Sequence, residues 1–210
     1  MKGLVGLAAL GLLLMSSPAW AVLEDLRPDA DVSDTGWDRT SDSSACSGVD
    51  CSVEINNEPT TGDTLSVEGT VCSGSGAEAD ITYRASLTEP TGPNTAWNGT
   101  NTQTIRYRAS RCASGTSTPT LSGRVWCNGD ADGSPQVTGA TENMANAEAV
   151  FTFTFTSASV TCDPTDIEIG FFCDGSGGSP SGRRSCLVDS IELDGDFTEP
   201  PVVRRRRWGN

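Results

Sequence analysis

An alternation of apolar and polar residues with a period of two is the feature that most constrains the fold of this chain. It is clearest at residues 151–156, where three phenylalanines alternate with three threonines. Because successive side chains of a strand point to opposite faces, the rings share one face and the hydroxyls the other. The same alternation runs through 81–87 and 105–110, and weaker forms occur at 52–55, 65–72, 121–127, 167–173 and 186–193. Strands are therefore predicted along most of the chain.

Turn-forming residues separate these segments. Glycine, proline, asparagine and aspartate cluster between them, most densely at 128–135 and 174–182, and such clusters indicate tight turns. Short antiparallel strands at this spacing are typical of two packed sheets. We therefore expect an all-β fold, a disulfide-stapled, jelly-roll-like antiparallel two-sheet sandwich of eight or nine strands. Only residues 141–149 suggest a helix, of two turns.

The two ends of the chain differ from its middle. A positive start precedes an apolar run from Leu4 to Met15 and then Ala19-Trp20-Ala21, which is the pattern of a signal peptide cleaved after Ala21. The run is shorter than the ~20 apolar residues of a membrane span, so no span is expected after cleavage. The predicted organisation is a signal peptide at 1–21, a lead-in at 22–30, one sandwich domain at 31–199 and a disordered Pro- and Arg-rich tail at 200–210.

Eight cysteines all lie beyond the predicted cleavage site. An even number of cysteines in an exported chain indicates disulfides, here four. No two cysteines have the spacing of a zinc knuckle, and the chain has no histidine to complete a mixed zinc site. Many pairings are open, but short loops favour three bridges and leave a fourth: Cys46–Cys51, Cys112–Cys127, Cys173–Cys186 and Cys72–Cys162.

Histidine is absent, and the formal net charge is -14. Without histidine the chain can build no Ser-His-Asp triad, no Cys-His pair and no imidazole metal site. The negative charge repels nucleic-acid phosphates and anionic membrane surfaces. Composition therefore favours a binding or structural protein over an enzyme, with no nucleic-acid partner.

Two segments resemble known β-sandwich domains. Residues 26–37 (LRPDADVSDTGW) resemble the opening of sandwich domains that recur in tailed-phage structural proteins and in bacterial secreted or surface proteins. Residues 187–193 (LVDSIEL) look like the last strand of jelly rolls, many of which are carbohydrate-binding modules. The resemblance implies a non-catalytic structural or adhesive role, and the cysteines favour an exported bacterial protein. We expect a secreted or cell-surface module that binds a glycan or a surface protein, with a structural subunit of a virion or surface appendage as the alternative.

Trp97 lies in a polar segment, residues 90–101, that holds two prolines and three asparagines. An exposed indole can stack on the apolar face of a sugar. Trp97 with Asn94 and Asn98 is therefore the candidate glycan contact. The alternative is that Trp97 folds back as a lid over the sandwich.

Other aromatic residues lie beside strand patterns. Trp37 and Trp126 are expected to be buried or half-buried. Tyr83 and Tyr107 occupy matching places in two strands and are expected to pack together inside, with a sugar platform as the alternative.

Oxygen-bearing side chains alternate in the segment 128–133 (NGDADG). Asn128, Asp130 and Asp132 match the first half of a calcium loop of the EF-hand kind. The second half does not match, because glycine occupies position 139, where a glutamate is expected. Calcium is the candidate ligand and no cofactor is otherwise required, while the alternative is a hairpin turn rich in Asn, Asp and Gly.

Carboxylates could form the acid and nucleophile of a glycosidase, which needs no histidine. Two groups are candidates, one near each of two late strands: Asp189, Glu192, Asp194 and Asp196, and Asp163, Asp166 and Glu168. Acidic residues are frequent in this chain, so a solvated face is the simpler interpretation. A glycosidase is kept as the third hypothesis.

Four arginines, Arg204 to Arg207, close the chain before Trp208. A basic tail on an acidic body is expected to lie against acidic surface, either its own or that of a neighbouring subunit. Self-association through this tail is therefore one prediction, and a merely disordered tail is the other.

Overall fold

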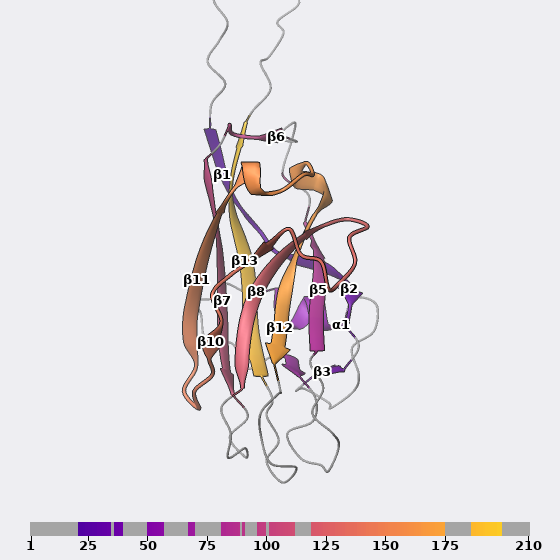
Figure 1. The fold of residues 1–210 in the computed structure, drawn as a ribbon, viewed down its shortest axis with the longest axis vertical. Coiled ribbons are helices and arrows are strands. Elements are labelled where there is room, and N and C mark those ends of the chain that lie inside the picture. The colour runs from indigo at the N-terminus through magenta and orange to yellow at the C-terminus, as the bar shows by residue number, and fades with distance from the viewer. Residues whose placement is uncertain are drawn as a thin grey trace, which may run out of the picture.

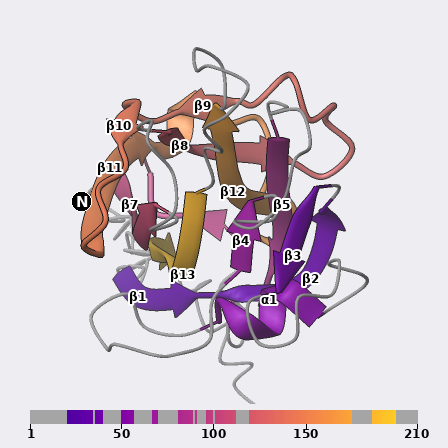
Figure 2. The ribbon, with the colours of Figure 1, turned by 90° about the horizontal axis from the view of Figure 1, so that it is seen from below.

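Two antiparallel sheets face each other in the computed structural model (Figure 1), and Figure 2 shows them from below. The structure describes residues 21–34, 36–39, 50–56, 67–69, 81–88, 90, 96–99, 101–111, 119–174 and 186–198. Some predicted features lie outside these residues: most of the signal peptide (1–20), Cys46, Cys72, Asn94, Cys112 and the tail with Arg204 to Arg207.

The seven-stranded sheet has the order β11-β7-β13-β4-β3, and β1 and β6 also pair with β13. Its strands are β1 (Ala21–Leu26), β3 (Trp37–Arg39), β4 (Val67–Gly69), β6 (Ala96–Trp97), β7 (Thr102–Arg111), β11 (Ala149–Thr156) and β13 (Cys186–Thr198). The long β13 lies at the centre of this sheet.

The six-stranded sheet has the order β10-β8-β12-β5-β2, with β9 also paired to β8. Its strands are β2 (Pro28–Ser33), β5 (Ile81–Leu87), β8 (Thr120–Cys127), β9 (Val137–Thr138), β10 (Glu142–Asn143) and β12 (Ile167–Asp174). The prediction of an all-β antiparallel two-sheet sandwich is confirmed. Eight of the described strands have six residues or more. The other described strands have two or three residues, which is too few to show an alternation in the sequence.

The rings of both sheets meet at Phe171 of β12. Phe171 stacks on Tyr83 of its own sheet at 6.2 Å and meets Tyr107 of the opposite sheet at 5.5 Å, between ring centroids. Trp37 packs edge-on against Tyr83 at 5.8 Å. Tyr83, Tyr107 and Trp37 are buried as predicted, and the two tyrosines are joined through Phe171.

The alternation in β11 behaves as predicted. Phe155 is buried, Phe151 and Phe153 are half-buried, and the three intervening threonines are exposed. Phe151 stacks on Tyr107 at 5.3 Å between ring centroids. The strand therefore covers one edge of the core with its rings.

Three segments differ from their predicted structure. The predicted strand at 52–55 is part of helix α1 (Asp50–Glu54), because the Asp31 carboxylate accepts hydrogen bonds from the N–H groups of Cys51 at 3.1 Å and Ser52 at 2.8 Å. The predicted helix at 141–149 is instead β10, a connection and the start of β11. The predicted lead-in at 22–30 lies in β1 and β2, which pair with β13 and β5.

Two disulfides join described cysteines. Cys173–Cys186 links β12 to β13, and so the two sheets, as predicted. The predicted bridges Cys112–Cys127 and Cys72–Cys162 are wrong, because Cys127 bonds to Cys162. The two cysteines that bond are 35 residues apart, so the shortest loop in sequence did not identify the partner of Cys127.

Cys51 is also disulfide-bonded, to a cysteine outside the described residues, and no described cysteine is free. Short 3-10 turns, η1 (Ser157–Ser159) and η2 (Pro164–Asp166), flank Cys162. Within the described part of the chain, no helix has the length and apolar character to cross a membrane.

Candidate functional site

Trp97 lies at one end of the sandwich, where β6 pairs with the last residues of β13. Its half-buried ring stacks on Phe197, with 5.5 Å between ring centroids, and meets Phe155 edge to face at 6.2 Å. The indole Nε1 donates a hydrogen bond of 2.9 Å to the carbonyl oxygen of Cys162. Trp97 therefore packs over the end of the sandwich, in the manner of the lid alternative, while part of its surface remains in contact with solvent.

Two asparagines orient a carboxylate beside Trp97. The side-chain amide of Asn98 donates to one oxygen of Asp196 at 2.9 Å, and that of Asn101 donates to the other at 2.6 Å. The backbone N–H of Asp196 donates to the side-chain oxygen of Gln103 at 2.7 Å. We call Trp97, Asn98, Asn101 and Asp196 the Trp97 corner.

The turn that carries these asparagines is pinned from the other side. The Ser157 hydroxyl donates to the carbonyl oxygen of Gly99 at 2.5 Å, and Gly99 has a φ of 58°, which glycine adopts without strain. Gly99, next to Asn98, is therefore anchored to Ser157.

Sequence reasoning found part of the Trp97 corner. Of the predicted glycan contacts, Trp97 and Asn98 lie in it, and Asn94 lies outside the described residues. Asn101 and Asp196 are additions, since they meet only because β6 pairs with β13, about a hundred positions later in the chain. The presence of three asparagines around Trp97 was the available signal for Asn101.

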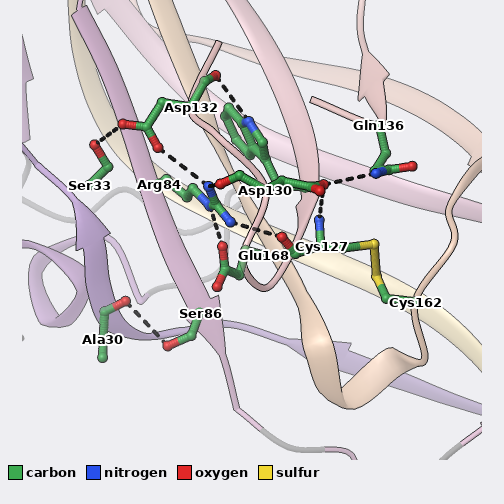
Figure 3. A network of polar contacts seen from close by, with 11 residues as sticks. Ala30, Ser33, Arg84, Ser86, Cys127, Asp130, Asp132, Gln136, Cys162 and Glu168 are labelled. Carbon is green, nitrogen blue, oxygen red and sulfur yellow. Dashed lines mark hydrogen bonds and ion pairs between the residues drawn. A yellow bond between two sulfur atoms is a disulfide. The ribbon is translucent and has the colours of Figure 1, made fainter. Parts of the chain in front are cut away.

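The predicted calcium segment belongs to a loop, residues 128–136, that lies over the outer face of the six-stranded sheet (Figure 3) and that we call the cover loop. One oxygen of Asp130 accepts hydrogen bonds from the backbone N–H of Cys127 and from the amide of Gln136, both at 2.9 Å. These donors lower the pKa of Asp130 below its usual range, with a smaller contribution from Arg84. Asn128 is exposed.

Asp132 ties the cover loop to β2. One of its oxygens accepts from the Ser33 hydroxyl at 2.6 Å, and the other lies 3.4 Å from a guanidinium nitrogen of Arg84. Its backbone carbonyl accepts from the indole N–H of Trp126 at 3.1 Å. Trp126 is fully buried, as predicted, but beneath this loop rather than between the sheets.

The buried cation under the cover loop is Arg84 (Figure 3). Its Nε donates to the buried carboxylate of Glu168, and its two Nη atoms donate to the carbonyl oxygens of Asp130 at 2.6 Å and Cys127 at 2.9 Å. The guanidinium also lies over the Trp126 ring, 5.5 Å from its centroid. Burial raises the pKa of Glu168, an effect that Arg84 opposes.

Carboxylate oxygens in the predicted calcium loop therefore accept hydrogen bonds from the protein. Among the described residues, no group of three or more acidic, cysteine or histidine side chains converges as a metal site. Calcium binding by Asn128, Asp130 and Asp132 stays a prediction. Sequence reasoning missed Arg84 because an arginine on the polar face of a strand pattern looks solvated, and only the fold shows what covers it.

Arginines pair with most of the carboxylates proposed for a glycosidase. On the outer face of the seven-stranded sheet, Arg106 lies 3.2 Å from Glu192 and 2.8 Å from Asp194. Arg108 lies 3.6 Å from Asp189. The shared geometry is that of ion pairs along neighbouring strands, which neutralise these acids. In the second group, Glu168 pairs with Arg84, whereas Asp163 and Asp166 are exposed beside η2.

Several solved structures are distantly similar to this chain. One described as "CBM4 structure and function" is 19% identical, with a TM-score of 0.40, over 78% of this chain and 95% of that chain. The N-terminal cellulose-binding domain of β-1,4-glucanase C from Cellulomonas fimi is 22% identical, with a TM-score of 0.38, over 76% and 88%. A "Family 16 Carbohydrate Binding Module-2" is 15% identical, with a TM-score of 0.35, over 64% and 79%.

These structures are named as carbohydrate-binding or cellulose-binding domains, and residues 187–193 resemble the last strand of such domains. No family model matches the chain, and no curated protein matches it. The likeness is distant, so the functional argument rests on the residues of this chain.

Proposed function

We propose that this chain is a secreted, non-catalytic module that binds a glycan at the Trp97 corner. The observation that carries the proposal is the Asp196 carboxylate, held by the amides of Asn98 and Asn101 at 2.9 and 2.6 Å beside a half-buried indole. A ring that offers apolar surface next to oriented hydrogen-bonding groups is what an amphipathic sugar requires.

The corner is ordered in advance, which favours affinity. Trp97 is fixed by its hydrogen bond to Cys162, and the turn is fixed by Ser157. Binding then spends little free energy on ordering side chains, a cost of about 0.5–1.5 kcal/mol for each one immobilised. Sugar hydroxyls would donate to Asp196 and accept from the two asparagines, with no bond broken in the sugar.

A glycan array with the purified full chain tests this proposal, followed by variants against the best glycan. Asp196→Ala should weaken binding about 10-fold or more, since it removes a charged acceptor, and Asn101→Ala, an exposed position, about 5-fold. Asp29→Ala and Asn128→Ala remove the same groups from exposed sites elsewhere and should change affinity less than 2-fold. No array signal from folded protein, or equal effects of both pairs of variants, would contradict the proposal.

Export is supported by the Cys127–Cys162 and Cys173–Cys186 disulfides, because disulfides persist in oxidising compartments. Mass spectrometry of the natural protein from culture medium or cell surface should find these two bridges intact and an N-terminus at residue 22. Recovery of reduced protein that still begins at Met1 would contradict export.

A structural subunit remains the second candidate function, and β11 favours it. In the described sheet β11 pairs on one side alone, with β7, and its eight residues contain no charge and no proline. Such an edge can pair with another chain. Thr152→Lys and Thr154→Lys should return any oligomer seen by size-exclusion chromatography to the monomer, and a wild type that stays monomeric at high concentration would remove this function.

A further inference from the structure

Arg124 stands apart among the described arginines. Arg27, Arg84, Arg106 and Arg108 each lie within 4.0 Å of a carboxylate, whereas no described group forms an ion pair with Arg124 or accepts a hydrogen bond from it. The protein has 28 acidic residues that could form an ion pair with an arginine, so an arginine without a described carboxylate partner needs an explanation.

The Arg124 guanidinium is held in place by an aromatic ring. Its central carbon lies over Phe172, 4.1 Å from the ring centroid, and both side chains are half-buried on the outer face of the six-stranded sheet. Stacking on a ring leaves the planar edge of the guanidinium, with its parallel N–H donors, free for a ligand. The Nε atom is buried and has no described acceptor.

Hydroxyl groups surround this pair. Arg124 is directly opposite Thr138 of β9, and Phe172 is opposite Ser122 of β8 and Thr82 of β5. All of these positions lie on the outer side of the sheet, because Ser122 and Arg124 are two residues apart on one strand. Ser122 is buried there, whereas Thr82 is half-buried and Thr138 is exposed.

Acidic residues on this face pair with Arg84 rather than with Arg124. Glu168, two residues from the position opposite Arg124 on β12, and Asp132 both contact Arg84 under the cover loop (Figure 3). Gly170, opposite Arg124 on β12, places no side chain between the two arginines. The outer face therefore presents one oriented, partly desolvated cation with no internal counter-ion among the described residues.

We propose that Arg124, stacked on Phe172 and flanked by Thr82 and Thr138, is a binding site for the anionic group of an acidic sugar. A carboxylate or sulfate ester would accept two parallel hydrogen bonds from the guanidinium edge, as such oxyanions do from arginine. The flanking hydroxyls would bond to neighbouring sugar hydroxyls.

The net charge of the protein also limits how many anionic groups the ligand can have. A net charge of -14 repels a dense polyanion, so the acidic sugar should occur singly in a mostly neutral glycan. The Arg124 site lies on the six-stranded sheet, whereas Trp97 belongs to the seven-stranded sheet. The inference rests on the proposed function in one respect, that the ligand is a sugar.

Titration of the full chain with four small probes, followed by nuclear magnetic resonance, tests the site. The probes are methyl glucuronoside, methyl glucoside 6-sulfate, methyl glucoside and acetate, in 50 mM salt. At least one anionic sugar should bind 10-fold or more tightly than the neutral sugar and than acetate, and comparison of the two assigns carboxylate or sulfate.

Variants locate the binding. Arg124→Gln should weaken it 10-fold or more and Arg124→Lys about 3-fold, since lysine keeps the charge but not the two parallel donors. Arg111→Gln makes the same charge change on β7 and should leave affinity within 2-fold. Asn101→Ala should also leave it unchanged, which separates this site from the Trp97 corner.

Equal binding of neutral and anionic sugars would overturn the proposal, as would unchanged affinity in folded Arg124→Gln. Acetate binding as tight as that of the acidic sugars would overturn the assignment to a sugar.

Discussion

Arg84 on β5 and Arg124 on β8 lie on either side of Gly170 of β12, in one row of the six-stranded sheet. Arg84 is 2% exposed, and its nitrogens donate to Glu168 and to two backbone carbonyls. Arg124 is half-buried and lies over the Phe172 ring, and no ion pair joins it to a described carboxylate. The cover loop supplies a hydrogen-bond acceptor and a carboxylate to Arg84 and, among the described residues, neither to Arg124, so the first cation stabilises the fold and we propose that the second binds a ligand.

The largest expected effect comes from removing Arg84. Arg84→Ala leaves Glu168 buried without its counter-ion and should lower the free energy of unfolding by about 3–5 kcal/mol, measured by urea denaturation. Arg124→Ala removes the contact with the Phe172 ring and should lower it by about 1 kcal/mol or less.

A double variant sharpens this prediction. Arg84→Met with Glu168→Leu removes both charges and should recover at least half of the loss, because paired buried charges can be replaced by apolar residues at little cost. Equal stability losses in Arg84→Ala and Arg124→Ala would break the comparison.

Opening the Cys127–Cys162 bridge should have the next largest effect, since Cys127 supplies one carbonyl to Arg84. The double alanine variant should lose about 2–4 kcal/mol. Removing Cys173–Cys186, whose sequence separation is 13 rather than 35, should cost about 1 kcal/mol less if the entropy of loop closure dominates. Thermal unfolding of both variants gives the order, and the reverse order would point to lost packing instead.

A smaller effect is expected where the cover loop meets β2. Ser33→Ala removes the hydrogen bond to Asp132 and should cost about 1 kcal/mol. Amide hydrogen exchange should then accelerate at 128–136 but not at β11, on the far edge of the other sheet. Acceleration throughout the protein would show that the loop is not a separate unit.

The smallest effect concerns acid. Hydrogen bonds from Cys127 and Gln136 lower the folded pKa of Asp130, so its stabilising contribution is complete above the unfolded pKa and is lost as pH falls through the folded one. Asp130→Asn should therefore lower stability at pH 7 more than at pH 3. A constant difference between wild type and variant across this range would show that the carboxylate charge is not responsible.

The strands were predictable where alternation was long. β5, β8, β11, β12 and β13 follow from local pattern alone, since one face of each meets the core. Residues 52–55 defeated the same rule because Asp31, twenty positions earlier, accepts hydrogen bonds from the N–H groups of α1. A partner twenty positions away cannot be identified from the residues of the segment itself.

The candidate sites show the same limit. Trp97 and the cover loop could be predicted as candidate sites from the residues around them. Asp196 lies beside Trp97 only because β6 pairs with β13. Arg84 and Arg124 have the same pattern in sequence, each an arginine among alternating strand residues. Only the fold reveals that Arg84 is buried and paired with Glu168 while Arg124 is half-buried over the Phe172 ring.

The most direct test of this contrast is to follow the side-chain Nε–H signals of the two arginines by nuclear magnetic resonance while the acidic sugar that binds more tightly is added. We predict that the Arg124 signal shifts in a saturable manner. The Arg84 signal should not shift, because its Nε–H donates to Glu168. A shift of the Arg84 signal, or no shift of either, would contradict the division between a cation that holds the fold and a cation that binds a ligand.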